Sequence, residues 1–160
     1  MERTLGGFRS RSSVTLRNIE YLKAVYKLGG KPGGCRVRIS DLSRELGVSA
    51  STVSIMVRRL EFKGLLSVKD NYGVCLTEKG LQVLVEYIWK HAILEAVMEK
   101  AGIDANTAHM IAKSLAQHLS NDEAWALSKA LGMPTHCPHG RRIPYPGTQL
   151  RFEVEYCGLD

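Results

Sequence analysis

The side chains with the clearest chemistry lie in the stretch LGVSASTVSIMVRRLEFKGLL, residues 46–66. Small hydroxyl residues stand near its start and basic residues towards its end. Hydroxyls can hydrogen-bond to base edges, isoleucine can contact a thymine methyl group, and arginine and lysine bind phosphate oxygens. The pattern therefore predicts contact with a nucleic acid. We expect this contact to be made by Ser49, Ser51, Thr52, Ile55, Arg58, Arg59 and Lys63, and by Lys69, Asn71 and Tyr72 in the segment that follows.

The charge distribution agrees with this prediction. The chain has 160 residues and a formal net charge of +6. Residues 1–80 contain 15 Lys/Arg against 7 Asp/Glu, a net charge of +8, whereas residues 81–160 contain 7 against 9, a net charge of −2. A positive field of this size favours polyanions, although charge alone does not distinguish DNA from RNA or from an acidic protein.

Other function classes find little support in the sequence. A nucleophile elbow, a phosphate-binding glycine loop and a defining acid/base pair are all missing, so we expect no enzyme. The longest apolar run, LQVLVEYIW at 81–89, is far shorter than the roughly 20 residues of a membrane-spanning helix, and no signal peptide precedes it. We expect a cytoplasmic protein without a membrane partner. Its scattered cysteines, none in a CxxC pair, are expected to be reduced thiols: Cys35, Cys75, Cys137 and Cys157.

Hydrophobic periodicity predicts the elements that would position the basic stretch. Apolar residues at helical spacing predict one helix from residue 18, a short second helix at 39–46 and a third from its cap at Ser49. Beta-prone residues on either side of Asn71 and Gly73 predict a hairpin. This order indicates a winged helix-turn-helix over residues 18–80, behind a flexible basic segment at 1–17. In such a fold the second helix of the motif enters the major groove.

The second half of the chain has a different pattern. A long amphipathic helix is predicted from Thr77 to about Lys100, followed by two shorter ones in ANTAHMIAKSLAQHLS and NDEAWALSKALG. We place the second module at 81–145 and a short tail at 146–160, in which QLRFEVEYC is one possible strand. His118 is interpreted as a buried, hydrogen-bonded histidine.

Several motifs resemble those of the diphtheria toxin repressor and manganese transport regulator family of metal-dependent transcriptional repressors. They are RISDLSRELGVSASTVSIMVRRLEFKGLL, LTEKG, WKHAILE, HLSNDEAWALSKALG and CPHGRRIP, within residues 19–145. The resemblance implies a mainly α fold, an N-terminal winged helix-turn-helix followed by an α-helical dimerisation module. It implies a homodimer that represses by binding a palindromic double-stranded DNA operator, with Fe, Mn or Zn as divalent cofactor. The barrel-like C-terminal domain of larger members would be absent or reduced to a strand.

The resemblance also implies two metal sites. In the primary site Glu20 and His91 match the family's first two ligands. The remaining three positions hold Lys113, Ala116 and Gln117, and neither a lysine ammonium nor an alanine can ligate a metal. The primary site therefore looks dismantled.

The family's ancillary site is better preserved. Its histidine and glutamate four residues apart correspond to His91 and Glu95, and its second histidine corresponds to His109. Two nitrogens and one oxygen suit Zn²⁺, Fe²⁺, Mn²⁺ or Ni²⁺. We expect metal at His91, Glu95 and His109, with Glu20 as a further candidate.

Other interpretations stay open at this point. His136, Cys137 and His139 in THCPHG are either metal ligands or parts of a structural turn. The whole chain could be a winged-helix regulator that has lost its metal switch, or a non-specific winged helix that binds DNA or RNA.

Overall fold

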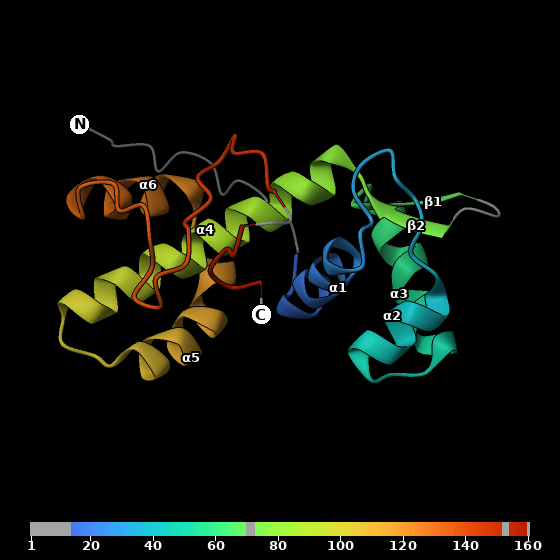
Figure 1. The fold of residues 1–160 in the computed structure, drawn as a ribbon, viewed down its shortest axis with the longest axis horizontal. Helices are drawn as coiled ribbons and strands as arrows, with labels where there is room; N and C mark the ends of the chain where they lie inside the picture. The colour runs from blue at the N-terminus through green and yellow to red at the C-terminus, as the bar shows by residue number, and fades with distance from the viewer. Residues whose placement is uncertain (1–13, 70–72, 152–153, 160) are drawn as a thin grey trace, which may run out of the picture.

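The computed structural model describes residues 14–69, 73–151 and 154–159. A winged helix-turn-helix and a helical module share one long central helix (Figure 1). This confirms the predicted fold class and the predicted order of elements. The elements are α1 (Leu16–Lys27), α2 (Ile39–Leu46), α3 (Ala50–Phe62), β1 (Leu66–Lys69), β2 (Gly73–Leu76), α4 (Glu78–Lys100), α5 (Ala105–Leu115), the 3-10 turn η1 (Ala116–His118) and α6 (Asn121–Ala130).

The helix boundaries follow from local capping. A capping box between Thr15 and Asn18 starts α1 at Leu16, inside the segment that we expected to be flexible. The box satisfies the amides of Thr15 and Asn18, which is why the helix begins two residues early. Gly47, with φ of 64°, ends α2 in the left-handed conformation, and Ser49 caps α3 as predicted.

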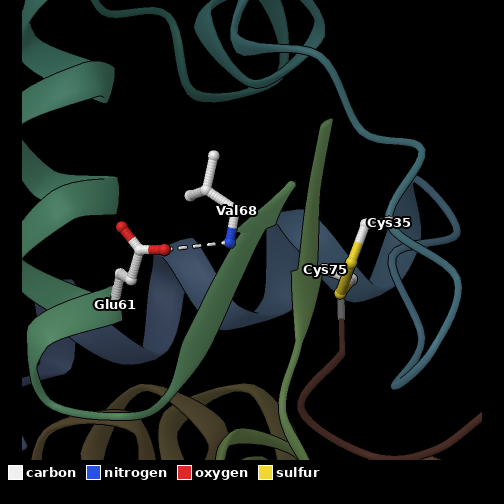
Figure 2. The surroundings of a disulfide bond; sticks show 4 residues. All are labelled: Cys35, Glu61, Val68 and Cys75. Carbon is white, nitrogen blue, oxygen red and sulfur yellow. Dashed lines mark hydrogen bonds between the residues drawn. A yellow bond between two sulfur atoms is a disulfide. The ribbon is translucent and has the colours of Figure 1, made fainter. Parts of the chain in front are cut away.

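The hairpin is joined to the preceding loop by a disulfide. Strands β1 and β2 are antiparallel with Ser67 opposite Cys75, and the loop before α2 runs alongside β2, where Val37 pairs with Val74. This places Cys35 beside Cys75, and the two form a disulfide with a Cα–Cα distance of 4.3 Å (Figure 2). Our expectation of four reduced thiols is therefore wrong for this pair. The spacing of 40 residues gave no signal of the pairing, because the path of the loop creates it.

The long helix α4 belongs to two hydrophobic cores. Its first half packs into the winged-helix core, and its second half packs with α6 and the segment after it. Gly80, in its first turn, lies so close to the Leu65 carbonyl that a Cβ atom would collide with it. In the second core, Trp89 packs on Trp125 at a centroid distance of 4.8 Å and donates a hydrogen bond to Ser128.

The C-terminal segment differs from its prediction. In the described residues of QLRFEVEYC we find a single parallel bridge between Arg142 and Tyr156, and no named strand. Tyr156 instead packs into the winged-helix core and Cys157 into the second core. In Figure 1 the red trace of residues 154–159 lies beside α4, between α1 and α5. None of the helices within 14–69, 73–151 and 154–159 combines the length and apolar composition needed to cross a membrane.

Candidate metal centre and nucleic-acid interface

The candidate metal centre is built around the carboxylate of Glu95 on α4. Glu95 is fully buried, and His91, one helical turn earlier, is 1% exposed. Nδ1 of His109, on α5, lies 2.6 Å from Glu95 Oε1, and Nε2 of His91 lies 3.6 Å from the same oxygen. The potential ligand atoms of these three residues all lie within 4.8 Å of one another. The structure thus brings together the three residues assigned to the ancillary site.

The second oxygen of Glu95 faces a different group of side chains. Cys157, in the C-terminal tail, donates a hydrogen bond to Oε2 over 2.9 Å, and Nδ1 of His139 lies 3.6 Å from that oxygen. The Cys137 thiol completes this side, since Glu95, Cys137 and Cys157 also place one potential ligand atom each within 4.8 Å of one another. Cys157 was missed by sequence reasoning, because nothing in the sequence connects it to the other residues.

Backbone hydrogen bonds hold the two thiols next to each other. The Cys137 amide donates to the carbonyl of Arg141 over 2.9 Å, and the Cys157 amide donates to the carbonyl of Arg142 over 3.2 Å. The Arg142 amide in turn donates to the carbonyl of Glu155. The turn in CPHG and the segment around Cys157 are therefore hydrogen-bonded to two consecutive residues, Arg141 and Arg142. The two interpretations of THCPHG do not exclude each other: the segment forms a turn, and the Cys137 thiol in that turn still lies beside other potential metal ligands.

The two thiols differ in acidity. The hydrogen bond with Cys157 lowers the pKa of Cys137 from 9.0 to about 6, against the opposing effect of burial. The same hydrogen bond, burial and the Glu95 carboxylate raise the pKa of Cys157. The two shifts run in opposite directions, so Cys137 is the more acidic thiol of the pair.

Glu20 does not belong to this centre. It is exposed on α1 and joins none of the potential ligand groups found in the described part of the chain. Its carboxylate is close enough to Tyr87 to contribute, after burial, to raising the pKa of that phenol to about 12. Glu20 and Lys113 line one groove. Among the described residues no set of three potential ligands includes Glu20, and its part as a further ligand stays a prediction.

The other positions of the family's primary site have structural roles. Ala116 is buried, and the side-chain oxygen of Gln117 accepts a hydrogen bond from the Leu16 amide over 2.9 Å, at the start of α1. The Tyr87 hydroxyl donates to the carbonyl of Lys113. His118 is exposed, so our interpretation of it as a buried histidine is wrong, because η1 turns it towards solvent.

The candidate nucleic-acid interface lies on α3. The hydroxyl of Ser49 is 3.0 Å from that of Ser51 and 2.8 Å from that of Thr52, which forms a small polar cluster at the start of the helix. Ile55, one turn later, is 54% exposed. Val53, Met56, Val57 and Leu60 occupy the opposite, buried face. The predicted orientation of the helix is therefore the one that the structure has.

The basic residues extend this surface towards the hairpin. Arg58, Arg59, Lys63 and Lys69 are all exposed. Lys63 donates a hydrogen bond to Asn18 of α1 over 3.4 Å, so its side chain is partly held by the protein. Asn71 and Tyr72, predicted for the tip of the wing, lie outside the described residues.

The comparisons with known proteins agree with this geometry. Residues 14–74 match the family model of the iron dependent repressor N-terminal DNA binding domain, and residues 77–145 match that of the iron dependent repressor metal binding and dimerisation domain. An uncharacterised HTH-type transcriptional regulator of Aeropyrum pernix is 45% identical over 137 residues, which are 86% of this chain and 76% of that protein.

Solved structures show the same similarity. A hypothetical protein of Sulfolobus solfataricus superposes with a TM-score of 0.73 at 29% identity, over 81% of this chain and 98% of that one. The regulator ScaR with bound Zn²⁺ gives a TM-score of 0.69 at 27% identity, over 84% of this chain but 63% of that one.

The matched metal-binding domain contains the entire His91, Glu95 and His109 set. Divalent metals are the cofactors of this family, and the matched N-terminal domain contains α3 with its exposed polar face. The chain belongs to the iron-dependent repressor family and is a transcriptional regulator with a DNA-binding domain and a metal-binding and dimerisation domain.

Proposed function

We propose that this chain is a cytoplasmic, dimeric repressor that binds a palindromic operator through α3 and is controlled by a divalent metal held by His91, Glu95 and His109. The observation that carries the proposal is the convergence of two imidazoles, from two helices, on one oxygen of a fully buried carboxylate. A buried carboxylate is costly unless its charge is balanced. A divalent cation at this point balances it and uses all three groups as ligands.

The donor chemistry fits that assignment. Two imidazole nitrogens and a carboxylate oxygen suit Fe²⁺, Mn²⁺ and Zn²⁺. His91 and Glu95 lie on one face of α4, since residues four apart are neighbours on a helix. His109 is brought to them by α5, whose N-cap Asp104 accepts a hydrogen bond from the Thr107 amide. When bound, the ion supplies a positive charge that ties α5 to α4.

Recognition is assigned to α3 with its hydroxyl cluster and exposed cations. Ser51, Thr52 and Ile55 face outward near its N-terminus, the part of a recognition helix that contacts base edges. Arg58, Arg59 and Lys69 would contact phosphates, which position the protein without reading sequence. Metal would fix the angle between α1 and α5, and so set the spacing of the two recognition helices of the dimer to one DNA turn.

Dimerisation is assigned to the exposed apolar face of α5. Met110 is 70% exposed, Leu115 47% and Ile111 36%, on a helix inside the matched dimerisation domain. A cluster of this kind is typical of a protein interface. Met110→Asp should therefore shift the protein to a monomer in sedimentation velocity, whereas Lys129→Asp on the exposed side of α6 should not. A Met110→Asp protein that sediments like the wild type would contradict this assignment.

The main test compares DNA affinity with and without metal. Duplexes enriched by selection with the purified protein would be titrated by fluorescence anisotropy, in chelator and then in Mn²⁺, Fe²⁺ or Zn²⁺. We expect at least one metal to raise affinity about 5- to 150-fold, the usual range of coupling between sites. His91→Ala/His109→Ala should remove the increase, and His118→Ala, an exposed histidine, should keep it.

The second candidate is a regulator that no longer responds to metal. It is favoured by Lys113, Ala116 and Gln117 at the primary positions, where Gln117 instead binds the α1 backbone. DNA affinity that is equal in chelator and metal, and unchanged in the double histidine variant, would select it. Equal affinity for all duplexes would select a non-specific nucleic-acid-binding winged helix.

A further inference from the structure

We infer that Cys137 and Cys157, together with the second oxygen of Glu95 and with His139, form a thiolate site for a zinc-class divalent cation. This inference rests on the proposed function, because it extends the same centre. Apart from Glu95, it concerns residues that the resemblance to known repressors does not assign as ligands. The expected ion is one that binds sulfur well, such as Zn²⁺, and not Mn²⁺, which prefers oxygen ligands.

The first argument is the arrangement of the donors. Cys157 lies 2.9 Å from Glu95 Oε2 and 3.5 Å from His91 Nδ1, and one potential ligand atom of Cys137 is within 4.8 Å of those of Glu95 and Cys157. Nδ1 of His139 lies 3.6 Å from the same carboxylate oxygen. Two sulfurs and one carboxylate oxygen are thus close enough to share one ion, and His139, beside the same carboxylate oxygen, offers the fourth donor that a tetrahedral zinc site takes.

The second argument is the burial of these groups. Cys137 is 5% exposed, Cys157 1% and Glu95 0%. Two thiols packed only for their apolar character would not need a carboxylate beside them, and a buried carboxylate gains little from a weak S–H donor. A cation is the ligand that accounts for all three groups, because each is a ligand once it has lost its proton.

The third argument is that the backbone holds this geometry. The Cys137 and Cys157 amides are bonded to the carbonyls of adjacent residues, Arg141 and Arg142. Gly158, with φ of +79°, brings the tail against His91, where a Cβ would lie 3.1 Å from Nδ1. Thiol ligands on a loop and a tail are thus positioned by hydrogen bonds and by close packing, as a metal site requires.

The test uses Co²⁺, whose bonds to thiolates give an intense near-ultraviolet charge-transfer absorption. The full-length protein, freed of metal, would be titrated with Co²⁺ and the spectrum compared among variants. We expect the band in the wild type, and we expect Cys137→Ser and Cys157→Ser each to weaken or abolish it. His118→Ala, which removes an exposed histidine outside the cluster, should keep it.

A second measurement avoids variants altogether. Because both thiols are buried, alkylation must follow opening of the fold, and Zn²⁺ should slow it at Cys137 and Cys157 of the wild type far more than Mn²⁺ does, as mapped by mass spectrometry. Each serine variant should lose Zn²⁺ affinity by at least the roughly 10- to 100-fold that removal of a ligand's supporting group costs, and keep its Mn²⁺ affinity.

The outcomes separate this inference from the proposed function. Co²⁺ that binds without the charge-transfer band, or alkylation unaffected by Zn²⁺, overturns the thiolate site even if metal still controls DNA binding. A thiolate band in a protein whose DNA affinity ignores metal supports the site and overturns the proposed control. A protein that binds neither Co²⁺ nor Zn²⁺ overturns the thiolate site, and one that also binds neither Mn²⁺ nor Fe²⁺ overturns the proposed control as well.

Discussion

The two halves of α4 stand in different surroundings. The first half places its own Leu84 and Ile88 among apolar residues of the winged helix, in a core whose described residues include no buried carboxylate. The second half buries His91 and Glu95 beside two thiols. One end is thus stabilised by apolar burial, which needs no ligand, and the other carries polar groups that a cation would stabilise. The comparison suggests that structural stability resides at the DNA-binding end and responsiveness at the other.

The largest expected effect is on the disulfide of the DNA-binding end. Cys75→Ser removes a cross-link between residues 40 apart, and loop-closure entropy predicts a loss of about 4 kcal/mol in the free energy of unfolding. Urea unfolding of the variant would measure it, and reduction of the wild type should give a similar loss. In metal-free protein, Cys157→Ser should cost much less. If Cys75→Ser and Cys157→Ser lowered the free energy of unfolding equally, the proposed difference in stability between the two ends of α4 would be wrong.

Replacement of Gly158 should have the next largest effect, and it should be confined to the metal-binding end. Gly158→Ala places a Cβ against His91 and forces a left-handed backbone on alanine, which costs roughly 1–2 kcal/mol before any clash. Gly147→Ala is the matched control, since Gly147 also has positive φ but has no atom within 4 Å of the Cβ position. Calorimetry and Zn²⁺ titration should show a larger loss for Gly158→Ala in both stability and affinity.

At the DNA-binding end, substitutions on α3 should leave the metal centre unchanged. Arg59→Ala should weaken binding to all duplexes and reduce the slope of log affinity against log salt by about 1. Thr52→Ala should mainly change sequence preference, by about 1–3 kcal/mol at one base position. An unaltered salt slope in Arg59→Ala would mean that this side chain does not contact phosphate.

The smallest effect is expected at the start of α5. A hydrogen bond with Thr107 lowers the pKa of Asp104, so its stabilising effect is present above the ordinary pKa of an aspartate and is lost as pH falls through the lowered value. Asp104→Ala should lower the melting temperature slightly near neutral pH, and Asp104→Asn, which can still cap the helix, should lower it less. A difference between wild type and Asp104→Ala that is as large in strong acid as near neutral pH would contradict this explanation.

The two halves also differ in how well sequence reasoning predicts them. Helical periodicity, the Ser49 cap and the Asn71–Gly73 turn signal are local features, and they predicted the winged helix element by element. The ancillary metal site could be predicted only from the family resemblance, since helical spacing places His91 beside Glu95 but does not bring His109 to them. Residues 91 and 157 meet only because the tail folds back over α4. Periodicity carries no information on such a path, nor on the pairing of Cys35 with Cys75.

The close contact between Gly80 and Leu65 bears on how a signal could travel. With 23 residues, α4 is about 34 Å long, and its first turn has no room to slide over the backbone that leads into the hairpin. The first turn of α4 and the winged helix are therefore expected to move together. A small rotation at His91 would swing the wing and recognition helix together as one rigid body, and the shape of the DNA-binding surface itself would not change.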